Sequence, residues 1–403
     1  MCGRASENLV CVLEAHSGEL GEAEAQKQEG IFSLAHKGDV MVEEKQHEKT
    51  HEKKTVKKAA SKDVKMAIER LPRVKLVHLP TPLVEAEELS RELGGPRILI
   101  KRDDLTGFAM GGTKGRMLEF SMGVAKQESF DVVILYAAAQ SNYSRQLAAA
   151  ASKLGMRTIL LLEPREVHEV QGNLLLDRIL GAEIEMVERI DNKFSAEGIR
   201  EFDEIHAKIV ERLRHEGHKP LVVDKWYHPS VWSVVGAIAC ALELCGQLSD
   251  ANLSPDYLFT TLGSGATYTG LLLGMKACAL PTKVVGVTIV EKRDGLHSAI
   301  VSRAHEATRL LGVDIDLSLD EVVFYDEYAG PAYGILTAEA KEAIKLVART
   351  EGIFLDPVYT GKAMSGLIDQ IRRGRIGQDK TVVFLHSGGT PALFAYHREL
   401  TDS

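Results

Sequence analysis

A lysine that follows two glycines is the first residue in this sequence whose type and position could support chemistry. Lys114 comes after Gly111, Gly112 and Thr113, a stretch that follows the short apolar run 98–100 and leads into a helix-like segment. Glycines let the backbone turn tightly and bring the lysine to the start of that segment. A lysine amine held away from bulk water can attack a carbonyl carbon, whereas most lysines are solvated surface charges. Lys114 therefore matters only if other parts of the chain complete a site.

A polar loop is the second candidate. Gln140, Ser141 and Asn142 follow an apolar run that is typical of a strand and precede an Ala-rich segment that is typical of a helix. Hydroxyl and amide groups beside the free N–H groups of a helix start can hold a carboxylate or a phenolic oxygen. Simple capping of the helix by Ser141 or Asn142 explains the same residues equally well.

A glycine-rich turn between a predicted strand and a predicted helix is the third candidate. Gly263 and Gly265 let several backbone N–H groups point at one anion, assisted by the helix dipole, so the turn predicts a phosphate cradle. Glu291 ends the next strand, where the ribose-binding acid of a dinucleotide site would stand. The third glycine is displaced to Gly270, however, and the dinucleotide spacing fails, so a monophosphate suits the turn better.

Two tyrosine-bearing loops and a last glycine loop complete the set. Tyr328 and Tyr359 lie in segments bounded by Gly and Pro, from which a phenol can reach into a cleft as an acid or a hydrogen-bond donor. Aromatic packing beneath a loop, with the hydroxyl in water, is the alternative. The segment His386 to Pro391 follows the final strand and could cap a cleft.

The elements that must position these residues alternate between strands and helices. Predicted strands cover residues 131–137, 157–162, 183–187, 221–223, 257–262, 283–290 and 381–386. Predicted helices cover residues 144–154, 171–180, 189–215, 233–248, 269–279, 292–311 and 337–351. This alternation indicates an α/β protein with parallel sheets and helices on both faces. The number of strands favours two domains with a cleft between them, and ligands in such folds bind at the carboxyl ends of the strands.

Composition narrows the class of protein. The 403 residues are 45% hydrophobic and 26% charged, with a net charge of −8, which argues against a nucleic-acid partner. Five cysteines are few and odd in number, as expected of reduced thiols in the cytoplasm. We see no apolar run of membrane-spanning length and no secretory signal, so we expect no membrane partner.

The N-terminal segment differs from the rest of the chain. We expect residues 1–62 to form a disordered charged arm, because the tract from Glu43 to Lys65 is crowded with Glu, Lys and His. His47 and His51 flank Glu48 in the HExxH pattern of zinc proteases. The pattern lacks an apolar stripe and a third ligand, so we interpret it as a product of biased composition and predict no metal site.

The candidates together describe a pyridoxal phosphate site, in which a lysine forms a Schiff base and a helix start binds the phosphate. Five motifs in order, spread over residues 71–396, resemble the D-cysteine desulfhydrase and 1-aminocyclopropane-1-carboxylate deaminase family, which has the tryptophan synthase β-like fold. The motifs are the stretch Lys101 to Lys114, Gln140 to Asn142, Gly172 to Asp177, Asp356 to Ala363 and His386 to Gly389. The resemblance implies a large cofactor-binding domain, residues 63–114 plus 233–403, a small substrate-side domain, residues 115–232, and a homodimer.

The resemblance also implies a role for each candidate residue. Lys114 would form the Schiff base and carry the proton at the substrate α-carbon. Asn142 would bond the phenolic oxygen of the cofactor, Gln140 and Ser141 would bind the substrate carboxylate, and Tyr328 and Tyr359 would face the substrate. The phosphate would be held by Gly263, Ser264, Gly265, Ala266 and Thr267, and the pyridine nitrogen would meet Thr360.

The residue type at position 360 distinguishes members of the family that catalyse different reactions. Ring-opening deaminases carry an acid at this position, which keeps the pyridine nitrogen protonated, whereas a neutral threonine leaves a weaker electron sink. We therefore expect β-elimination from a small amino acid, with D-cysteine giving sulfide, pyruvate and ammonia. The alternatives are 1-aminocyclopropane-1-carboxylate deaminase activity, cysteate sulfo-lyase activity or a non-catalytic cofactor-binding homologue. Two departures from the family pattern bear on the substrate: Thr113 replaces an asparagine, and residues 224–233 are bulky where glycines are usual.

Overall fold

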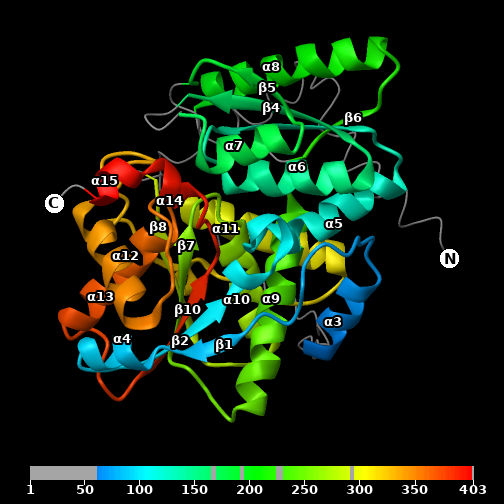
Figure 1. Ribbon diagram of the computed structural model, residues 1–403. Coiled ribbons are helices and arrows are strands. Elements are labelled where there is room, and N and C mark those ends of the chain that lie inside the picture. Colours follow the sequence, from blue (N-terminus) through cyan, green and yellow to red (C-terminus); the bar gives the residue numbers. More distant parts are fainter. Residues whose placement is uncertain (1–60, 165–168, 191–194, 224–229, 291–294, 402–403) are drawn as a thin grey trace, which may run out of the picture. The chain divides into compact units, whose positions relative to one another are not determined.

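The computed structural model describes residues 61–164, 169–190, 195–223, 230–290 and 295–401, whose strands form two sheets (Figure 1). The larger sheet has the strand order β1-β2-β10-β7-β8-β9; β1 pairs antiparallel with β2, and the other pairs recorded in register are parallel. Its strands are Leu83–Glu85 (β1), Arg97–Arg102 (β2), Tyr257–Leu262 (β7), Lys283–Thr288 (β8), Val323–Tyr325 (β9) and Thr381–His386 (β10).

The smaller sheet has the order β5-β4-β3-β6 and its strand pairs are parallel. Its strands are Val132–Ala138 (β3), Arg157–Glu163 (β4), Glu183–Met186 (β5) and Pro220–Val222 (β6). Strand β3 is apolar along most of its length because both of its faces are covered. Val133 and Leu135 pack into one hydrophobic cluster, while Val132 and Ile134 pack into another.

Helices connect the strands and cover the sheets (Figure 1). They are α3 (Ser61–Glu69), α4 (Glu87–Glu92), α5 (Lys114–Gln127), α6 (Asn142–Leu154), α7 (Gly172–Ile179), α8 (Ala196–His215), α9 (Val231–Asp250), α10 (Ala266–Ala277), α11 (Leu296–Leu311), α12 (Ala338–Glu351), α13 (Thr360–Arg372), α14 (Ala392–Ala395) and α15 (His397–Thr401). Short 3₁₀ turns lie at Asp103–Leu105, Phe108–Met110 and Leu319–Glu321.

Helix α9 is a core helix despite its apolar composition. Within the residues that the structure describes, it is the one helix long and apolar enough to cross a membrane, yet 67% of its most apolar window is buried inside the protein. It packs against α5 and α10. The approach to α10 is close: a Cβ added to Gly270 would lie 2.5 Å from Ala237 Cβ. Burial by neighbouring helices therefore explains the apolar sequence.

Most predicted elements are present, and the differences concern their bounds and several elements that were not predicted. Helix α10 begins at Ala266 instead of residue 269, because Gly265 turns directly into the helix. Helix α13 was not predicted, because glycines within it and a proline before it hide its periodicity. The short helices α4, α14 and α15 and the three-residue strands β1 and β9 were not predicted because they are too short to show a period. Helix α3 begins at Ser61 and buries Val64 and Ile68, so the end of the charged tract is folded.

Some expectations lie outside the described residues. These are the predicted arm as far as residue 60, with His47 and His51, and also residues 224–229 and Glu291. The two sheets draw their strands from residues 83–102 plus 257–386 and from residues 132–222, respectively. The domain boundaries 63–114 plus 233–403 and 115–232 remain a prediction.

A buried ionic network fixes the start of α5 to β2 and α9. Arg116 Nη2 donates to Asp103 Oδ1 at 2.8 Å and to Glu243 Oε1 at 2.9 Å. Lys101 Nζ donates to Glu243 Oε1 at 2.5 Å and to the carbonyl of Thr81 at 2.7 Å. Burial alone would raise the pKa of Asp103, but Arg116 holds it below its ordinary value. The stretch from Lys101 to Lys114 therefore supplies, besides Lys114, the charged side chains of Lys101 and Asp103, which belong to the network that fixes α5.

Substitution of Asp103 by Asn is expected to lower the free energy of unfolding by about 3–5 kcal/mol, because it leaves the buried Arg116 charge without its closest counter-ion. Urea titration followed by circular dichroism measures the change. Glu85→Gln is the matched control: it removes the exposed ion pair with Arg97 and should cost under about 1 kcal/mol. Equal effects of the two substitutions would contradict a structural role for the network.

Candidate active site

The loop before Lys114 is shaped by glycines with no room for a side chain. Gly111 and Gly112 have φ values of 73° and 122°. A Cβ on Gly111 would lie 1.8 Å from the carbonyl oxygen of Asp104, and a Cβ on Gly112 would lie 2.6 Å from Gln146 Nε2. Gly112 N–H donates to the carbonyl of Asp103 at 3.0 Å, which closes the turn. The chain then enters α5 with Lys114 as its first residue.

The loop after β10 lies between the Lys114 loop and a second motif. Thr113 N–H donates to the carbonyl of Ser387 at 2.9 Å. A Cβ on Gly388 would lie 2.5 Å from Gly112 Cα, and a Cβ on Gly389 would lie 2.6 Å from Asp356 Cγ. Three segments that are remote in sequence, ending at Lys114, at Gly389 and at Thr360, are therefore in direct contact.

The turn from Asp356 to Thr360 is organised by one buried carboxylate. Asp356 Oδ2 accepts from the N–H groups of Val358 at 3.0 Å and Tyr359 at 2.9 Å. Asp356 Oδ1 accepts from the N–H and from the hydroxyl of Thr360, both at 2.7 Å. Thr360 Oγ1 in turn accepts from Asp356 N–H at 2.7 Å. The hydroxyl proton of Thr360 is thus committed to Asp356.

Asn142 stands at the start of α6 with its amide orientation fixed. Its Oδ1 accepts from Asn173 Nδ2 at 2.9 Å and from Arg145 Nη1 at 3.2 Å. Arg145 also donates from Nη2 to the carbonyl of Gly111 at 2.9 Å, which links this residue to the Lys114 loop. Since the carbonyl end of Asn142 faces two donors, its NH₂ end is the one that can meet an oxygen in the site.

The other two residues of the polar loop have local partners. Ser141 caps α6, and its Oγ accepts from the N–H groups of Tyr143 and Ser144. Gln140 is held at both ends of its amide: Nε2 donates to the carbonyl of Gln171 at 3.0 Å, and Oε1 accepts from Asn173 N–H at 2.9 Å. Capping, the alternative weighed for Ser141, therefore occurs, and the Gln140 side chain joins the loop to α7.

Two buried ionisable groups, Arg145 and Asp177, lie behind Asn142. Burial lowers the pKa of Arg145 to about 10, and the carboxylates of Asp177 and Asp356 oppose that shift. Asp177 is fully buried, and burial raises its pKa to about 8 against the opposing charge of Arg145. Within the described part of the chain, neither carboxylate oxygen of Asp177 has a hydrogen-bond partner. Asp177 therefore keeps its proton at neutral pH and releases it near pH 8.

The glycine-rich turn after β7 leads directly into the start of a helix. Gly265 adopts φ 99° and is followed directly by α10, whose first N–H groups have no partner within the helix. Thr267 lies in the first turn of α10 and is buried. Gly263, Ser264 and Ala266 precede it in the chain. Arg303 of α11 lies against the turn, since a Cβ on Gly265 would lie 2.8 Å from its Nη1. Its proximity adds a cation that the motif did not predict.

The tyrosines of the third motif separate into two environments. The hydroxyls of Tyr333 and Tyr359 are 2.5 Å apart, with the rings edge to face. Tyr328 instead donates its hydroxyl to Asp369 Oδ2 at 2.5 Å and accepts from Gln370 Nε2 at 2.7 Å. Burial and Asp369 raise the pKa of Tyr328 to about 12. The partner of Tyr359 is Tyr333, whereas the hydroxyl of Tyr328 is directed at α13.

Lys362 secures the loop that carries Tyr333. Its Nζ donates to the carbonyl of Ala329 at 2.5 Å, and its side chain is fully buried. Burial lowers the pKa of Lys362 to about 8, while the carboxylate of Asp356 opposes that shift. One buried lysine thus connects the Asp356 turn to the tyrosine loop.

Similarity to known proteins shows the family of this chain. The family described as pyridoxal-phosphate dependent enzyme matches residues 74–388. The chain belongs to this family. It is 35% identical over 338 residues to a D-cysteine desulfhydrase of Yersinia enterocolitica, a match that covers 83% of this chain and 98% of the relative. A D-cysteine desulfhydrase of Serratia proteamaculans is 35% identical over 343 residues, covering 84% of this chain and 100% of the relative.

A solved structure gives the same result for the fold. The crystal structure of an ACC deaminase homologue is similar, with a TM-score of 0.75 and 34% identity, and the match covers 84% of this chain and 98% of that one. These similarities confirm the family resemblance and the two-domain fold of parallel sheets. They also confirm pyridoxal phosphate as the cofactor and small amino acids as the class of substrate.

The described residues suit pyridoxal phosphate. The turn with Gly265 at φ 99° opens a helix start to an anion, and Arg303 lies beside it. The oriented amide of Asn142 presents an NH₂ group, which is the donor that a phenolic oxygen requires. The Lys114 loop touches the loop of Gly388, which in turn touches the segment that ends in Thr360. The described residues therefore offer an amine, an amide donor, a helix start with a nearby cation and a hydroxyl, which are groups of the kinds that pyridoxal phosphate requires.

Sequence reasoning missed several residues of this arrangement. Asn173 and Asp177 belong to a recognised motif that carried no assigned role, and Asp356 begins another. Arg145 lies one helical turn after Asn142, a spacing that could have suggested their contact. Nothing in the sequence distinguishes Tyr333 from Tyr328, because both lie in the same Gly- and Pro-bounded segment.

Asp177→Asn should change how stability depends on pH. The folded state keeps a proton on Asp177 up to about pH 8, whereas the unfolded state releases it near its ordinary value of 3.8. Wild-type stability therefore falls as the pH rises through this window, and the variant lacks this contribution. The free energy of unfolding of the variant relative to wild type, from urea titrations at about pH 5 and about pH 8, should be more favourable at the higher pH.

Asp314→Asn provides the comparison, because Asp314 is an exposed carboxylate on the same protein. Because its side chain is exposed, its substitution should change the free energy of unfolding by under about 0.5 kcal/mol in both titrations. A difference for Asp177→Asn that also stays constant would show that Asp177 is ionised throughout the range.

Proposed function

We propose that this protein is a β-eliminating lyase that converts D-cysteine to sulfide, pyruvate and ammonia. The D-cysteine desulfhydrases that match over nearly their full length support this substrate. The observation that carries the proposal is the contact of three remote segments, which brings the Lys114 loop, the Gly388 loop and the Asp356–Thr360 turn together. D-cysteine and water balance the three products.

Lys114 is the proposed attachment and proton-transfer residue. Bound pyridoxal phosphate supplies an electron-withdrawing ring that stabilises negative charge at the substrate α-carbon. Lys114 would hold the cofactor covalently through Nζ and then move the α-proton of the substrate. Its position as the first residue of α5, after a loop whose glycines leave no room for side chains, supports such a role.

Asn142 and the turn after β7 are the proposed cofactor ligands. Asn142 would donate from Nδ2 to the phenolic oxygen. The residues proposed to hold the phosphate are Gly263, Ser264, Gly265, Ala266 and Thr267. We add Arg303, because its guanidinium lies beside Gly265 and brings a positive charge to the cradle.

Ser141 is the proposed ligand of the substrate carboxylate. Its oxygen accepts from two N–H groups at the start of α6, which leaves its hydroxyl proton as the group to donate. Gln140, which was expected to share this role, has both ends of its amide bonded to residues at the start of α7. We propose that Gln140 positions the loop and that Ser141 and the helix start bind the carboxylate.

Tyr333 replaces Tyr328 as the proposed partner of Tyr359 at the substrate. One of the two hydroxyls donates to the other, and the acceptor hydroxyl can pass its own proton to a neighbouring atom, such as a departing thiolate. Burial, together with the neighbouring Tyr333, raises the pKa of Tyr359 well above its ordinary value, which keeps this phenol protonated. A protonated phenol is the form that can serve as an acid.

Thr360 is the proposed partner of the ring nitrogen, but not as an isolated neutral group. Its hydroxyl proton faces Asp356, so the group that it offers is an oxygen lone pair. A lone pair favours a nitrogen that carries a proton, with the carboxylate of Asp356 behind it to balance the charge. The neutral side chain of Thr360 therefore does not by itself argue for β-elimination, and the choice of reaction depends on the relatives.

The second candidate function is ring-opening deamination of 1-aminocyclopropane-1-carboxylate. The similar ACC deaminase homologue favours it, and so does the Asp356–Thr360 pair, which supports a protonated ring nitrogen as a carboxylate would. Cysteate sulfo-lyase activity and a non-catalytic cofactor-binding role complete the alternatives.

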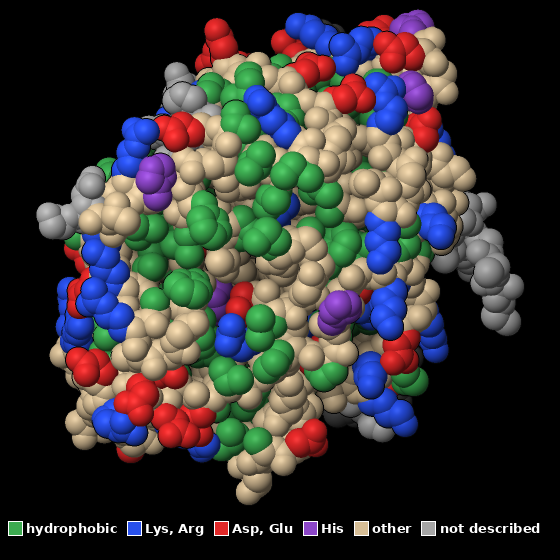
Figure 2. All heavy atoms as spheres, in the orientation of Figure 1, with side chains coloured by type: hydrophobic (Ala, Val, Ile, Leu, Met, Phe, Trp, Pro, Cys, Tyr) green, Lys and Arg blue, Asp and Glu red, His purple; other side chains and the backbone are tan. Residues whose placement is uncertain are grey.

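The proposed assembly is a homodimer in the cytoplasm, with no nucleic-acid or membrane partner. Hydrophobic side chains gather over the central part of the face drawn in Figure 2. Among the exposed large hydrophobic residues, Leu175 and Ile179 of α7 and Phe394 of α14 are 41%, 70% and 63% exposed, and the two helices are in contact. An exposed apolar patch of this kind supports self-association.

The proposal predicts that the purified holoenzyme releases sulfide and pyruvate in equal amounts from D-cysteine. Coupled reduction of pyruvate and colorimetric detection of sulfide measure the two products. Lys114→Ala should abolish both and remove the visible absorbance of the covalently held cofactor. Release of a four-carbon keto acid from 1-aminocyclopropane-1-carboxylate, without sulfide from D-cysteine, would favour the second candidate.

The tyrosines provide a matched pair within the same experiment. Tyr333→Phe should lower kcat by about 10²-fold or more, the typical contribution of a positioned acid. Tyr328→Phe removes a hydroxyl that is bonded to α13 and should leave kcat within about threefold of wild type. The reverse order of effects would restore Tyr328 to the site.

A further inference from the structure

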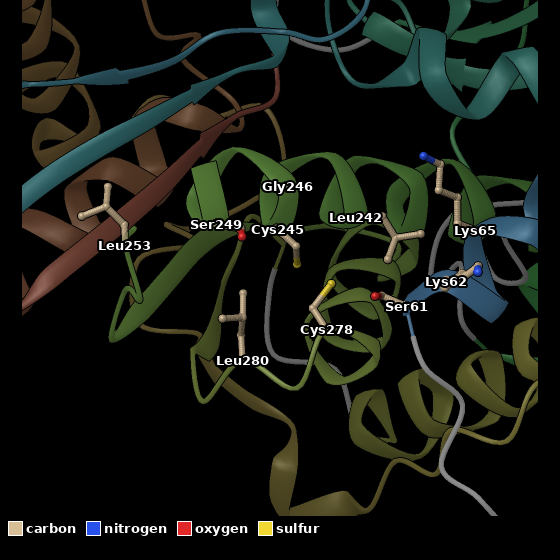
Figure 3. A pocket seen from close by; sticks show the side chains of 10 residues that line it. All are labelled: Ser61, Lys62, Lys65, Leu242, Cys245, Gly246, Ser249, Leu253, Cys278 and Leu280. Carbon is tan, nitrogen blue, oxygen red and sulfur yellow. The ribbon is translucent and has the colours of Figure 1, made fainter. Parts of the chain in front are cut away.

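A pocket of about 540 Å³ lies where α3, α9 and the end of α10 meet (Figure 3). Lys62 and Lys65 of α3, Cys245 of α9 and Cys278 at the end of α10 are among its lining residues. None of the residues assigned above to the active site lines it. Its volume falls in the range of roughly 300–1,000 Å³ that suits a small molecule.

Two thiols face each other in this pocket. Figure 3 shows the sulfur atoms of Cys245 and Cys278 pointing toward one another from the two helices. The Cys245 thiol donates to Met275 Sδ at 3.9 Å. The interaction between the two neighbouring cysteines lowers the pKa of Cys278 and raises that of Cys245. Both residues are partly exposed. Cys278 is therefore the better nucleophile, since the thiolate is the attacking form, and Cys245 is its nearest thiol.

The charge at the pocket selects the class of reactant. Lys62 and Lys65 provide two cations on one short helix, and the described lining contains no carboxylate. Apolar side chains such as Leu242 and Leu280 provide the remaining wall. An anionic molecule of tripeptide size fits this combination of charge and volume better than a cationic or neutral one.

We propose that this pocket is a thiol-exchange site for anionic low-molecular-weight disulfides, with Cys278 as the attacking thiol and Cys245 as the resolving thiol. The inference is independent of the proposed function. The Cys278 thiolate attacks one sulfur of the external disulfide, a mixed disulfide forms, and one external thiolate leaves and takes up a proton. Cys245 then gives its proton to solvent and attacks the Cys278 sulfur. The second external thiolate leaves, so one external disulfide is reduced while two protein thiols are oxidised.

Cys240 provides a comparison within the same helix. It lies 1% exposed, and its sulfur is 3.5 Å from Asp103 Oδ2. Burial raises the pKa of its thiol above the ordinary value. Neither access nor thiolate character is available there, so Cys240 should not react.

The experiment treats the full-length holoenzyme with oxidised glutathione and maps each cysteine by peptide mass spectrometry. Wild-type protein should give a Cys245–Cys278 disulfide and leave Cys240 reduced. Cys245→Ser should stop at a glutathione adduct on Cys278. Cys278→Ser should slow modification of Cys245 by at least about tenfold, because the activated thiolate is gone.

Charge selectivity is tested with a neutral probe. Lys62→Gln combined with Lys65→Gln should slow the reaction with oxidised glutathione by about threefold or more, as expected for loss of exposed charge contacts, and leave the rate with hydroxyethyl disulfide unchanged. Equal slowing with both probes would overturn the anion site. Absence of any adduct or disulfide at Cys245 and Cys278, while cysteines elsewhere react, would overturn the proposal as a whole.

Discussion

Four hydrogen bonds converge on the buried carboxylate of Asp356, from the N–H groups of Val358, Tyr359 and Thr360 and from the Thr360 hydroxyl. Burial raises the pKa of Asp356, and these donors oppose that shift by favouring the ionised form. The carboxylate therefore sets the shape of the turn and the direction of the Thr360 hydroxyl at once. A buried charge with all of its acceptor positions satisfied is rigid, because any movement leaves a donor unpaired.

The neighbouring parts of the site depend on this turn. Gly389 packs against Asp356 with no space for a side chain, and the same loop holds the segment of Lys114 through Thr113 and Ser387. The carboxylate of Asp356 acts on the pKa values of two buried side chains, Arg145 and Lys362, and favours the charged form of each. Arg145 orients Asn142, and Lys362 secures the loop of Tyr333. The proposed phenolic-oxygen ligand and the proposed acid are thus both connected to one carboxylate.

The sequence predicted those features that depend on local rules. Gly111 and Gly265 adopt positive φ where a tight turn was expected, and the strands that precede the polar and glycine-rich loops are present. Hydrogen bonds between residues that are far apart in the sequence could not be predicted from local rules. Gln140 carries an amide suited to a carboxylate, but residues at the start of α7 occupy both ends of it. Only the packing of α6 against α7 reveals that competition.

The direction in which a side chain points is the second feature that could not be predicted from the sequence. Tyr328 and Tyr333 lie in one segment with similar neighbours in sequence, and the choice between them is made by Asp369 and Gln370 of α13, a helix that was not predicted. Thr360 was interpreted as a neutral group because its own side chain is neutral. Its hydroxyl is bonded to a carboxylate four residues earlier, and this contact changes the chemistry that it can offer.

The binding constant for pyridoxal phosphate in Asp356→Asn, measured by absorbance titration of the apoprotein, tests the role of this carboxylate most directly. The substituted amide has one acceptor oxygen, so at least one pair of the four donors must face an NH₂ group, at a cost of about 1–3 kcal/mol for each buried donor. We expect binding to weaken by about tenfold or more, with the fold retained by circular dichroism, whereas Asp369→Asn within α13, the helix that follows the Asp356 turn, leaves it unchanged. Unchanged binding in Asp356→Asn would contradict the account.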